Sequence, residues 1–286
     1  MLLSEILIEK IIVSPQIHDK IQTAILSWIE AAIPYVDNNL SSIDHNKKQI
    51  TELLRRRLAP TITNIVKQYR QPIPDPEYMG HKVNVEVDIL HAYSEAGSVR
   101  SSWTKYRDVP KMRTAYVYKN TLNITLSPYQ ISNIVLHKNE NSIGELVSTI
   151  THEITHLIQS LSSRRNSVYN KNYYSTGADK DTRYYMAKFE IDAHAQSLAS
   201  EILSKSKKMP DPIKYIQNIL PLIGMGIQTV FNRPTFPSKH YQEIKNLLTS
   251  PSDDPKLAEA KKRAWRRFNK RIYEKLSNYL EHLQQK

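Results

Sequence analysis

Cysteine is absent from this chain of 286 residues, and glycine occurs only six times. Without cysteine, neither a disulfide framework nor a thiolate metal site can form. Any bound metal must therefore be held by histidine and carboxylate side chains. The scarcity of glycine limits the number of turns that need a positive φ angle, which favours a mostly helical protein.

Long apolar runs are also missing. The longest, at about residues 219–231, is too short and too interrupted to span a bilayer. The apolar N-terminus carries Glu5 and Glu9 before Lys10, and it lacks the basic start and the small-residue cleavage site of a signal peptide. We therefore expect no membrane association and a protein that is either cytoplasmic or virion-associated.

Positive charge is concentrated near the C-terminus. The formal net charge is +12, and residues 206–286 hold 16 Lys and Arg against 7 Asp and Glu. A helix expected from about residue 255 to residue 283 carries most of these cations, with Trp265 and Phe268 among them. One interpretation is contact with nucleic acid or an acidic partner. We favour the other, a solvated helix whose aromatic residues pack on the core, because no nucleic-acid-binding motif accompanies the charge.

Hydrophobic periodicity predicts helices and strands in the first half of the chain. Residues 2–70 show helical spacing, including a helix over about residues 44–68 that is interrupted at Pro60, and a Pro-rich boundary follows at residues 71–76. Alternation of apolar and polar residues predicts a strand at residues 83–89. It also predicts a hairpin, with strands at 114–118 and 122–126 joined by a turn at 119–121.

Helical spacing returns in the second half. A helix over residues 142–161 is expected to begin at a capping box formed by Ser142 and Glu145. A polar loop follows, then a helix over about residues 183–203, and the remainder is helical. We predict a mostly helical α+β fold with a small antiparallel-containing sheet. Its expected parts are an N-terminal helical segment, a central α+β core and a basic C-terminal helical segment, at residues 1–75, 76–205 and 206–286.

A short histidine motif lies inside the helix expected over residues 142–161. Its two histidines, His152 and His156, are four residues apart and so lie one turn apart on the same side of a helix. Both imidazoles can therefore reach one metal ion, and Glu153 between them can take a proton from water. This is the His-Glu-x-x-His pattern of zinc hydrolases, and we expect one zinc ion per chain.

The residues around the motif also agree with a metal-binding helix. Apolar residues fall on one side at 100° per residue and both histidines on the other, so one side can pack on a core while the other faces a cleft. Gln159 and Ser162 exclude the metzincin pattern, which needs Gly and His at those positions. Two alternatives stay open: an amphipathic helix with two solvated histidines, and an inactive relative that keeps the motif.

The chain resembles the gluzincin zinc peptidases, in which the His-Glu-x-x-His helix is followed by a helix bearing Glu-x-x-Ala. Glu190 and Ala193 match that second motif, so the resemblance implies that Glu190 is the third metal ligand. The variant Glu-Ile-Asp-Ala-His-Ala at residues 190–195, after paired tyrosines, is also similar to small predicted metallopeptidases encoded by tailed phages. The resemblance covers about residues 110–203. His194, one turn beyond Glu190, stays the competing third ligand.

The resemblance implies hydrolysis of peptide bonds by metal-activated water, with Glu153 as the general base. The oxyanion of that reaction needs a donor besides the metal, and His194 and Tyr184 are the candidates. By analogy with such enzymes, the peptide substrate lies along an edge strand, for which residues 122–126 are the candidate. The alternative function is a non-catalytic virion or nucleic-acid-associated protein that retains a zincin-like core.

Overall fold

The computed structural model describes residues 15–37, 40–68, 83–90, 98–105, 118–162, 180–207, 209–224 and 239–284. The described chain is mostly helical with a small sheet, and it divides into two compact units whose main parts are residues 16–162 and 163–286. The first part of the expected helical region, at residues 2–14, lies outside the described residues, as do the Pro-rich boundary at 71–76 and the polar loop at 163–179. The three expected segments were drawn from composition and charge, and they stay a prediction.

The first unit begins with helices α2 (Pro15–Ala32) and α3 (Leu40–His45), with a short 3₁₀ turn between them at Ile33–Tyr35. Helix α4 (Lys47–Gln68) follows and runs through Pro60, so the expected interruption there is wrong. Proline lacks the amide that would bond the carbonyl one turn back. Burial of apolar residues on both sides of Pro60, including Leu58 and Ile62, stabilises the helix across this position.

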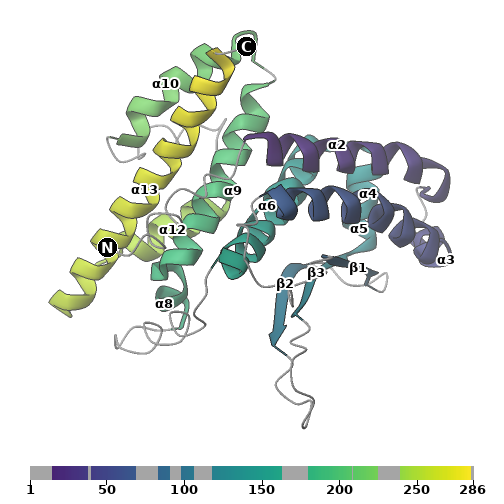
Figure 1. Cartoon of the computed structure of the whole chain (residues 1–286), viewed down its shortest axis with the longest axis horizontal. Coiled ribbons are helices and arrows are strands. Elements are labelled where there is room, and N and C mark those ends of the chain that lie inside the picture. The colour runs from purple at the N-terminus through teal and green to yellow at the C-terminus, as the bar shows by residue number, and fades with distance from the viewer. Residues whose placement is uncertain are drawn as a thin grey trace. The chain divides into compact units, whose positions relative to one another are not determined.

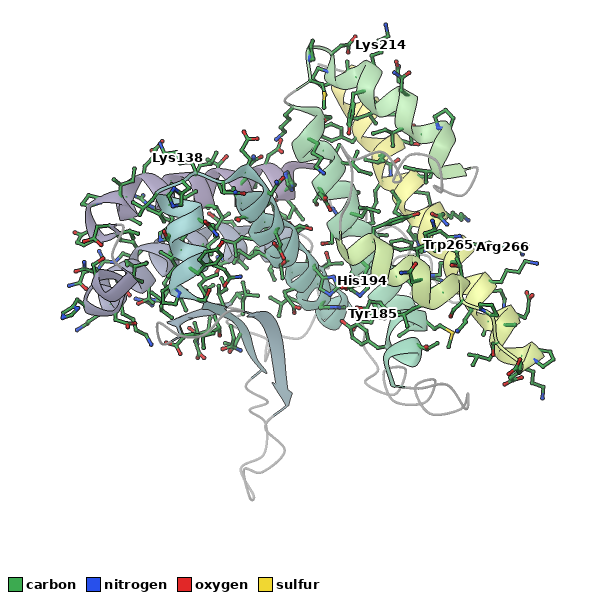
Figure 2. All side chains as sticks on the ribbon, turned by 180° about the vertical axis from the view of Figure 1, so that it is seen from behind. Lys138, Tyr185, His194, Lys214, Trp265 and Arg266 are labelled. Carbon is green, nitrogen blue, oxygen red and sulfur yellow. The ribbon has the colours of Figure 1, made fainter. Side chains whose placement is uncertain are left out.

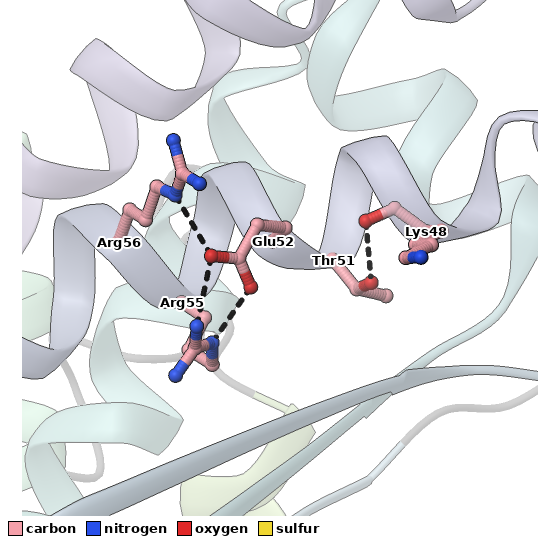
Figure 3. Close-up of polar contacts among 5 residues, drawn as sticks. All are labelled: Lys48, Thr51, Glu52, Arg55 and Arg56. Atoms are coloured by element: carbon pink, nitrogen blue, oxygen red, sulfur yellow. Dashed lines mark hydrogen bonds and ion pairs between the residues drawn. The ribbon is translucent and has the colours of Figure 1, made fainter.

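The exposed side of α4 is stabilised by a local ion-pair cluster (Figure 3). Glu52 accepts hydrogen bonds from Arg55 at 2.8 Å and from Arg56 at 2.7 Å, at the i+3 and i+4 spacings that place side chains together on a helix. These bonds, Arg55 first, lower the pKa of Glu52 to about 2. The carboxylate therefore stays charged across the pH range in which most proteins are folded, although solvent around the exposed arginines limits what the cluster contributes to stability.

A three-stranded sheet follows, in the order β1-β3-β2. Its strands are β1 (Asn84–Ile89), β2 (Ser98–Lys105) and β3 (Tyr118–Leu126). Strand β1 pairs in parallel with β3, whereas β2 pairs antiparallel with β3. Lys47 of α4 binds the end of β1 through an ion pair with Asp88 at 2.8 Å and a hydrogen bond to the carbonyl of Ile89.

The hairpin expected around residues 119–121 is wrong. Those residues lie inside β3, where each is paired with a residue of β2, so their backbone groups belong to a ladder and not to a turn. The two strands that the sequence did predict at 83–89 and 122–126 are neighbours, and they run parallel. A polar run such as Lys-Asn-Thr indicates a turn only locally, and pairing with β2 overrides that signal.

Two helices connect the sheet to the candidate site. Helix α5 (Pro128–Val135) was not expected, although Ser127 and Gln130 form a capping box at its start. Helix α6 (Glu140–Ser162) begins two residues before the expected position, and the side chain of Asn139 accepts a 3.1 Å bond from the amide of Ser142. Asn139 is therefore the capping residue, and the expected cap at Ser142 is wrong.

The second unit contains five described helices: α8 (Lys180–Met186), α9 (Lys188–Ser206), α10 (Pro212–Gly224), α12 (Lys239–Thr249) and α13 (Pro255–Gln284). Helices α9 and α13 lie side by side, with α10 along α13 (Figure 1). Their shared core includes Ile191, Leu198, Phe268 and Ile272. The single helix expected over residues 183–203 is wrong, because the chain is extended at Ala187 and starts a new helix there. No described helix has both the length and the apolar character needed to cross a bilayer.

Candidate metal centre

The two motif histidines converge at the surface of α6. The Nε2 atoms of His152 and His156 lie 3.0 Å apart, and the rings are nearly perpendicular at 88° with centroids 4.6 Å apart. Two nitrogen ligands of a tetrahedral zinc ion, each at ~2.0–2.1 Å, lie about 3.4 Å apart. The spacing of the imidazole nitrogens is therefore close to that of two ligands on one ion.

The opposite side of α6 fixes this orientation. The apolar residues predicted to form a core-facing side are buried: Leu146, Val147, Ile150, Ile154, Leu157 and Ile158. The helix also packs against β2 and β3. Both histidines lie outside the arc of the helix that these apolar residues cover. Because the apolar side is held in this way, the histidines are directed to the other side of the helix. His152 is itself buried at 7% exposure, so the interpretation of two solvated histidines does not hold for it.

The hydroxyl groups of the threonines beside the histidines donate hydrogen bonds to carbonyl groups of the helix backbone. The hydroxyl of Thr151 donates to the carbonyl of Val147 at 2.7 Å, and that of Thr155 donates to the carbonyl of Thr151 at 2.8 Å. These buried hydroxyls are satisfied within the helix and are not directed at the metal position. Glu153 is only partly buried.

Glu190 reaches its position because of the break at Ala187. Ala187 has an extended backbone and precedes the first residue of α9, so Glu190 is the third residue of that helix. A continuous helix would have placed Glu190 in its interior. The Glu190 residue is buried at 5% exposure.

His194 lies one turn further along α9 and is also buried. Its Nε2 is 3.7 Å from Oε2 of Glu190. The ring centroid of His194 lies 5.8 Å from that of Tyr184 and 5.1 Å from that of Tyr185, and Figure 2 shows the Tyr185 and His194 side chains together. The two residues proposed as oxyanion donors, His194 and Tyr184, are therefore neighbours beside Glu190.

Three of the predicted residues can share a metal ion. One ligand atom from each of His152, His156 and Glu190 lies within 4.8 Å of the others, and no other such group of three was found in the described ranges. Two imidazoles and a carboxylate form a donor set that suits zinc and other first-row divalent ions. His194 is outside this group of three.

One contact at this site was not foreseen from sequence. Asp192 of α9 binds Arg271 of α13, with Oδ1 3.0 Å from Nε, and its other oxygen is 3.5 Å from Arg267. The Asp192 side chain therefore holds α9 against α13 and is not a candidate ligand. Its partners are 79 and 75 residues away in sequence, and no local pattern could have identified them.

Comparisons with protein-family models, with curated proteins and with solved structures find no match to this chain. Its function must therefore be inferred from the residues of the site.

Proposed function

We propose that this chain is a zinc-dependent peptidase with a zincin-like core. The observation that supports the proposal is the grouping of His152, His156 and Glu190, whose ligand atoms lie within 4.8 Å of one another. The motif order supports it as well, because a general-base carboxylate, Glu153, comes directly after the first histidine. Zinc bound by these three side chains would supply Lewis-acid chemistry, which makes bound water more acidic and polarises a carbonyl group.

The other residues of the site have separate roles in this proposal. Glu153 takes the proton from water and passes it to the leaving amine. His194 and Tyr184 donate hydrogen bonds to the oxyanion, which needs donors placed before the reaction begins. Burial of His152, Glu190 and His194 strengthens these electrostatic interactions because little water competes with them.

The sheet changes the expected position of the peptide. Strand β3 is central, with β1 on one side and β2 on the other, so residues 122–126 cannot accept a further strand. The earlier assignment of these residues as the substrate strand is therefore wrong. Strand β2 lies at a sheet edge and packs against α6, and we propose that an extended peptide pairs with β2.

Metal analysis of purified variants tests the ligand set. We expect about one zinc per chain in the wild type, because the three protein ligands form a single metal site. Zinc should be lost in His152→Ala and in Glu190→Ala, and it should be retained in His194→Asn. If zinc is retained in Glu190→Ala but lost in His194→Asn, His194 is the third ligand. If zinc is retained in both His152→Ala and Glu190→Ala, the proposed site is refuted.

Peptide hydrolysis by Glu153→Gln tests the catalytic role. The amide keeps the size of the carboxylate but cannot take a proton, so we expect kcat to fall by about 10²–10⁴-fold while zinc content is unchanged. Asp211→Asn is the control, because Asp211 is an exposed carboxylate in the turn before α10. A wild-type protein that binds zinc and cleaves no peptide in a broad library would favour the non-catalytic alternative.

A further inference from the structure

Eight of the nine Lys and Arg residues of α13, all except Lys275, fall into two groups that the sequence alone could not separate. Three of them make contacts within the second unit: Lys261 binds the hydroxyl of Ser250 at 2.9 Å, and Arg267 and Arg271 bind Asp192. Five others are exposed on the helix, and we call them the basic face: Lys256, Lys262, Arg263, Arg266 and Lys270. The basic face is therefore not needed to hold the helix in place.

The basic face carries an unbalanced charge. Over residues 256–270 the one acidic side chain is Glu259, which is also exposed. Lys270 lies 3.7 Å from Glu274, but no ion pair of Lys262, Arg263 or Arg266 is found within the described part of the chain. Figure 2 shows Arg266 extending away from the ribbon of α13. A row of cations that outnumbers its carboxylate neighbours attracts anions from solution.

The spacing of these cations is regular. Lys262, Arg266 and Lys270 are four residues apart, so successive charges are displaced by about 6 Å along the helix and stay on one side of it. A nucleic-acid strand carries one phosphate per about 3.4 Å of duplex axis, so each of these side chains can reach a different phosphate. Tyr273, 44% exposed, lies on the same side and offers an aromatic ring for stacking on a base.

The inner side of α13 makes this surface rigid. Phe268 and Ile272 are buried in the core of the second unit, and the rings of Trp265 and Phe268 pack near Tyr241 with centroids 5.8 to 6.0 Å apart. The cations therefore project from a helix whose position is already fixed. A fixed row of charges loses less conformational entropy on binding than a flexible basic tail.

We propose that the basic face of α13 binds the phosphate backbone of nucleic acid. A membrane surface fits less well, because a membrane-binding helix needs an apolar side for insertion and the apolar side of α13 is buried in the core. An acidic protein fits less well, because the face has regularly spaced charges and, apart from Tyr273, no exposed large apolar side chain that could act as an anchor. This inference is independent of the peptidase proposal.

Fluorescence anisotropy with the full chain tests the proposal. The probes are a labelled oligothymidine and a labelled duplex of about 20 nucleotides each, long enough to cover the roughly 21 Å from Lys256 to Lys270. For about four phosphate contacts, log K should fall with log salt at a slope of about −3 to −4. In Lys262→Glu/Arg266→Glu we expect binding at least about 10-fold weaker and a slope reduced by about 2.

The control variant is Lys138→Glu/Lys214→Glu, which has the same net charge change at two exposed lysines outside α13 (Figure 2). The control should bind both probes within about 3-fold of the wild type if the basic face, and not the overall charge, is responsible. An equal loss in both double variants would overturn the proposal. So would binding to anionic phospholipid vesicles, or to polyglutamate, with no binding to either oligonucleotide in low salt.

Discussion

The carboxylate of Asp192 accepts a 3.0 Å hydrogen bond from Nε of Arg271, and this contact links the helix that carries Glu190 to α13. Both side chains are mostly buried, at 18% and 15% exposure. Asp192 lies two residues beyond Glu190 on α9. The pair therefore fixes the start of α9, and with it the position of the candidate metal ligand.

Arg271→Met should destabilise the protein and weaken metal binding together. The substitution removes the nearest ion-pair partner of the largely buried Asp192 and leaves Arg267 at 3.5 Å. We therefore expect a loss of about 2 kcal/mol in the free energy of unfolding. The zinc Kd should rise about 10-fold, as is usual when a group that positions a ligand is lost. Chemical denaturation and a competitive zinc titration measure the two effects.

Lys270→Met is the matched control for Arg271→Met. Lys270 is the preceding residue on α13, its side chain is 75% exposed, and it lies 3.7 Å from Glu274. An exposed pair of this kind contributes less than about 0.5 kcal/mol. Equal effects of the two substitutions on zinc affinity would show that Asp192 and Arg271 do not position Glu190.

The start of α6 offers a test of which residue caps it. Asn139→Ala removes the side-chain oxygen that accepts the amide of Ser142, and we expect a loss of about 1 kcal/mol in the free energy of unfolding. Ser142→Ala should change stability by only a few tenths of a kcal/mol, because Ser142 is already inside the helix. Thermal and urea unfolding measure both variants. The opposite ranking would mean that the helix starts at Ser142.

Lys275 should make the free energy of unfolding depend on pH in the alkaline range. Burial lowers the pKa of its amine from 10.5 to about 8, and the nearby charge of Arg271 adds to this, whereas Asp192 and Glu274 oppose it. Below pH 8 both the folded and unfolded chains hold the proton, so the folded state bears the full cost of the buried charge. Between pH 8 and 10.5 the unfolded chain holds a proton that the folded chain has released, so this contribution becomes less unfavourable as pH rises.

Lys275→Met isolates that contribution. The variant should be more stable than the wild type at pH 7, and its advantage should shrink between pH 8 and 10.5. Urea unfolding of both proteins across this range gives the difference, in which the titration of all shared groups cancels. A difference that is constant with pH would show that the amine of Lys275 titrates normally in the folded protein.

The sequence predicted those features that depend on local periodicity. The apolar side of α6 and its paired histidines follow from a repeat of 3.6 residues, and the alternation at residues 83–89 identified β1. Glu190 could be named only through its resemblance to a second motif. The two imidazoles are close because they are one turn apart, but nothing in the local pattern specifies that a carboxylate 34 residues later approaches them.

The errors occurred where a local signal had a competing explanation. Residues 119–121 have the composition of a turn, yet pairing with β2 makes them part of a strand. Ser142 and Glu145 match a capping box, but Asn139 lies earlier and caps the helix first. The residues around Ala187 are good helix formers, so the break between α8 and α9 has no signal in propensity. In the first two cases strand pairing or a neighbouring residue outweighed the pattern.

The extended residue Ala187 also has an electrostatic consequence. By starting a new helix three residues before Glu190, it places a negatively charged side chain among backbone amides that have no partner within the helix. The positive end of the helix dipole stabilises an anion there by about 0.3–1 kcal/mol, whereas the same side chain in the middle of a continuous helix would gain none of this. One non-helical alanine thus gives a buried anion a favourable local field that requires no cation.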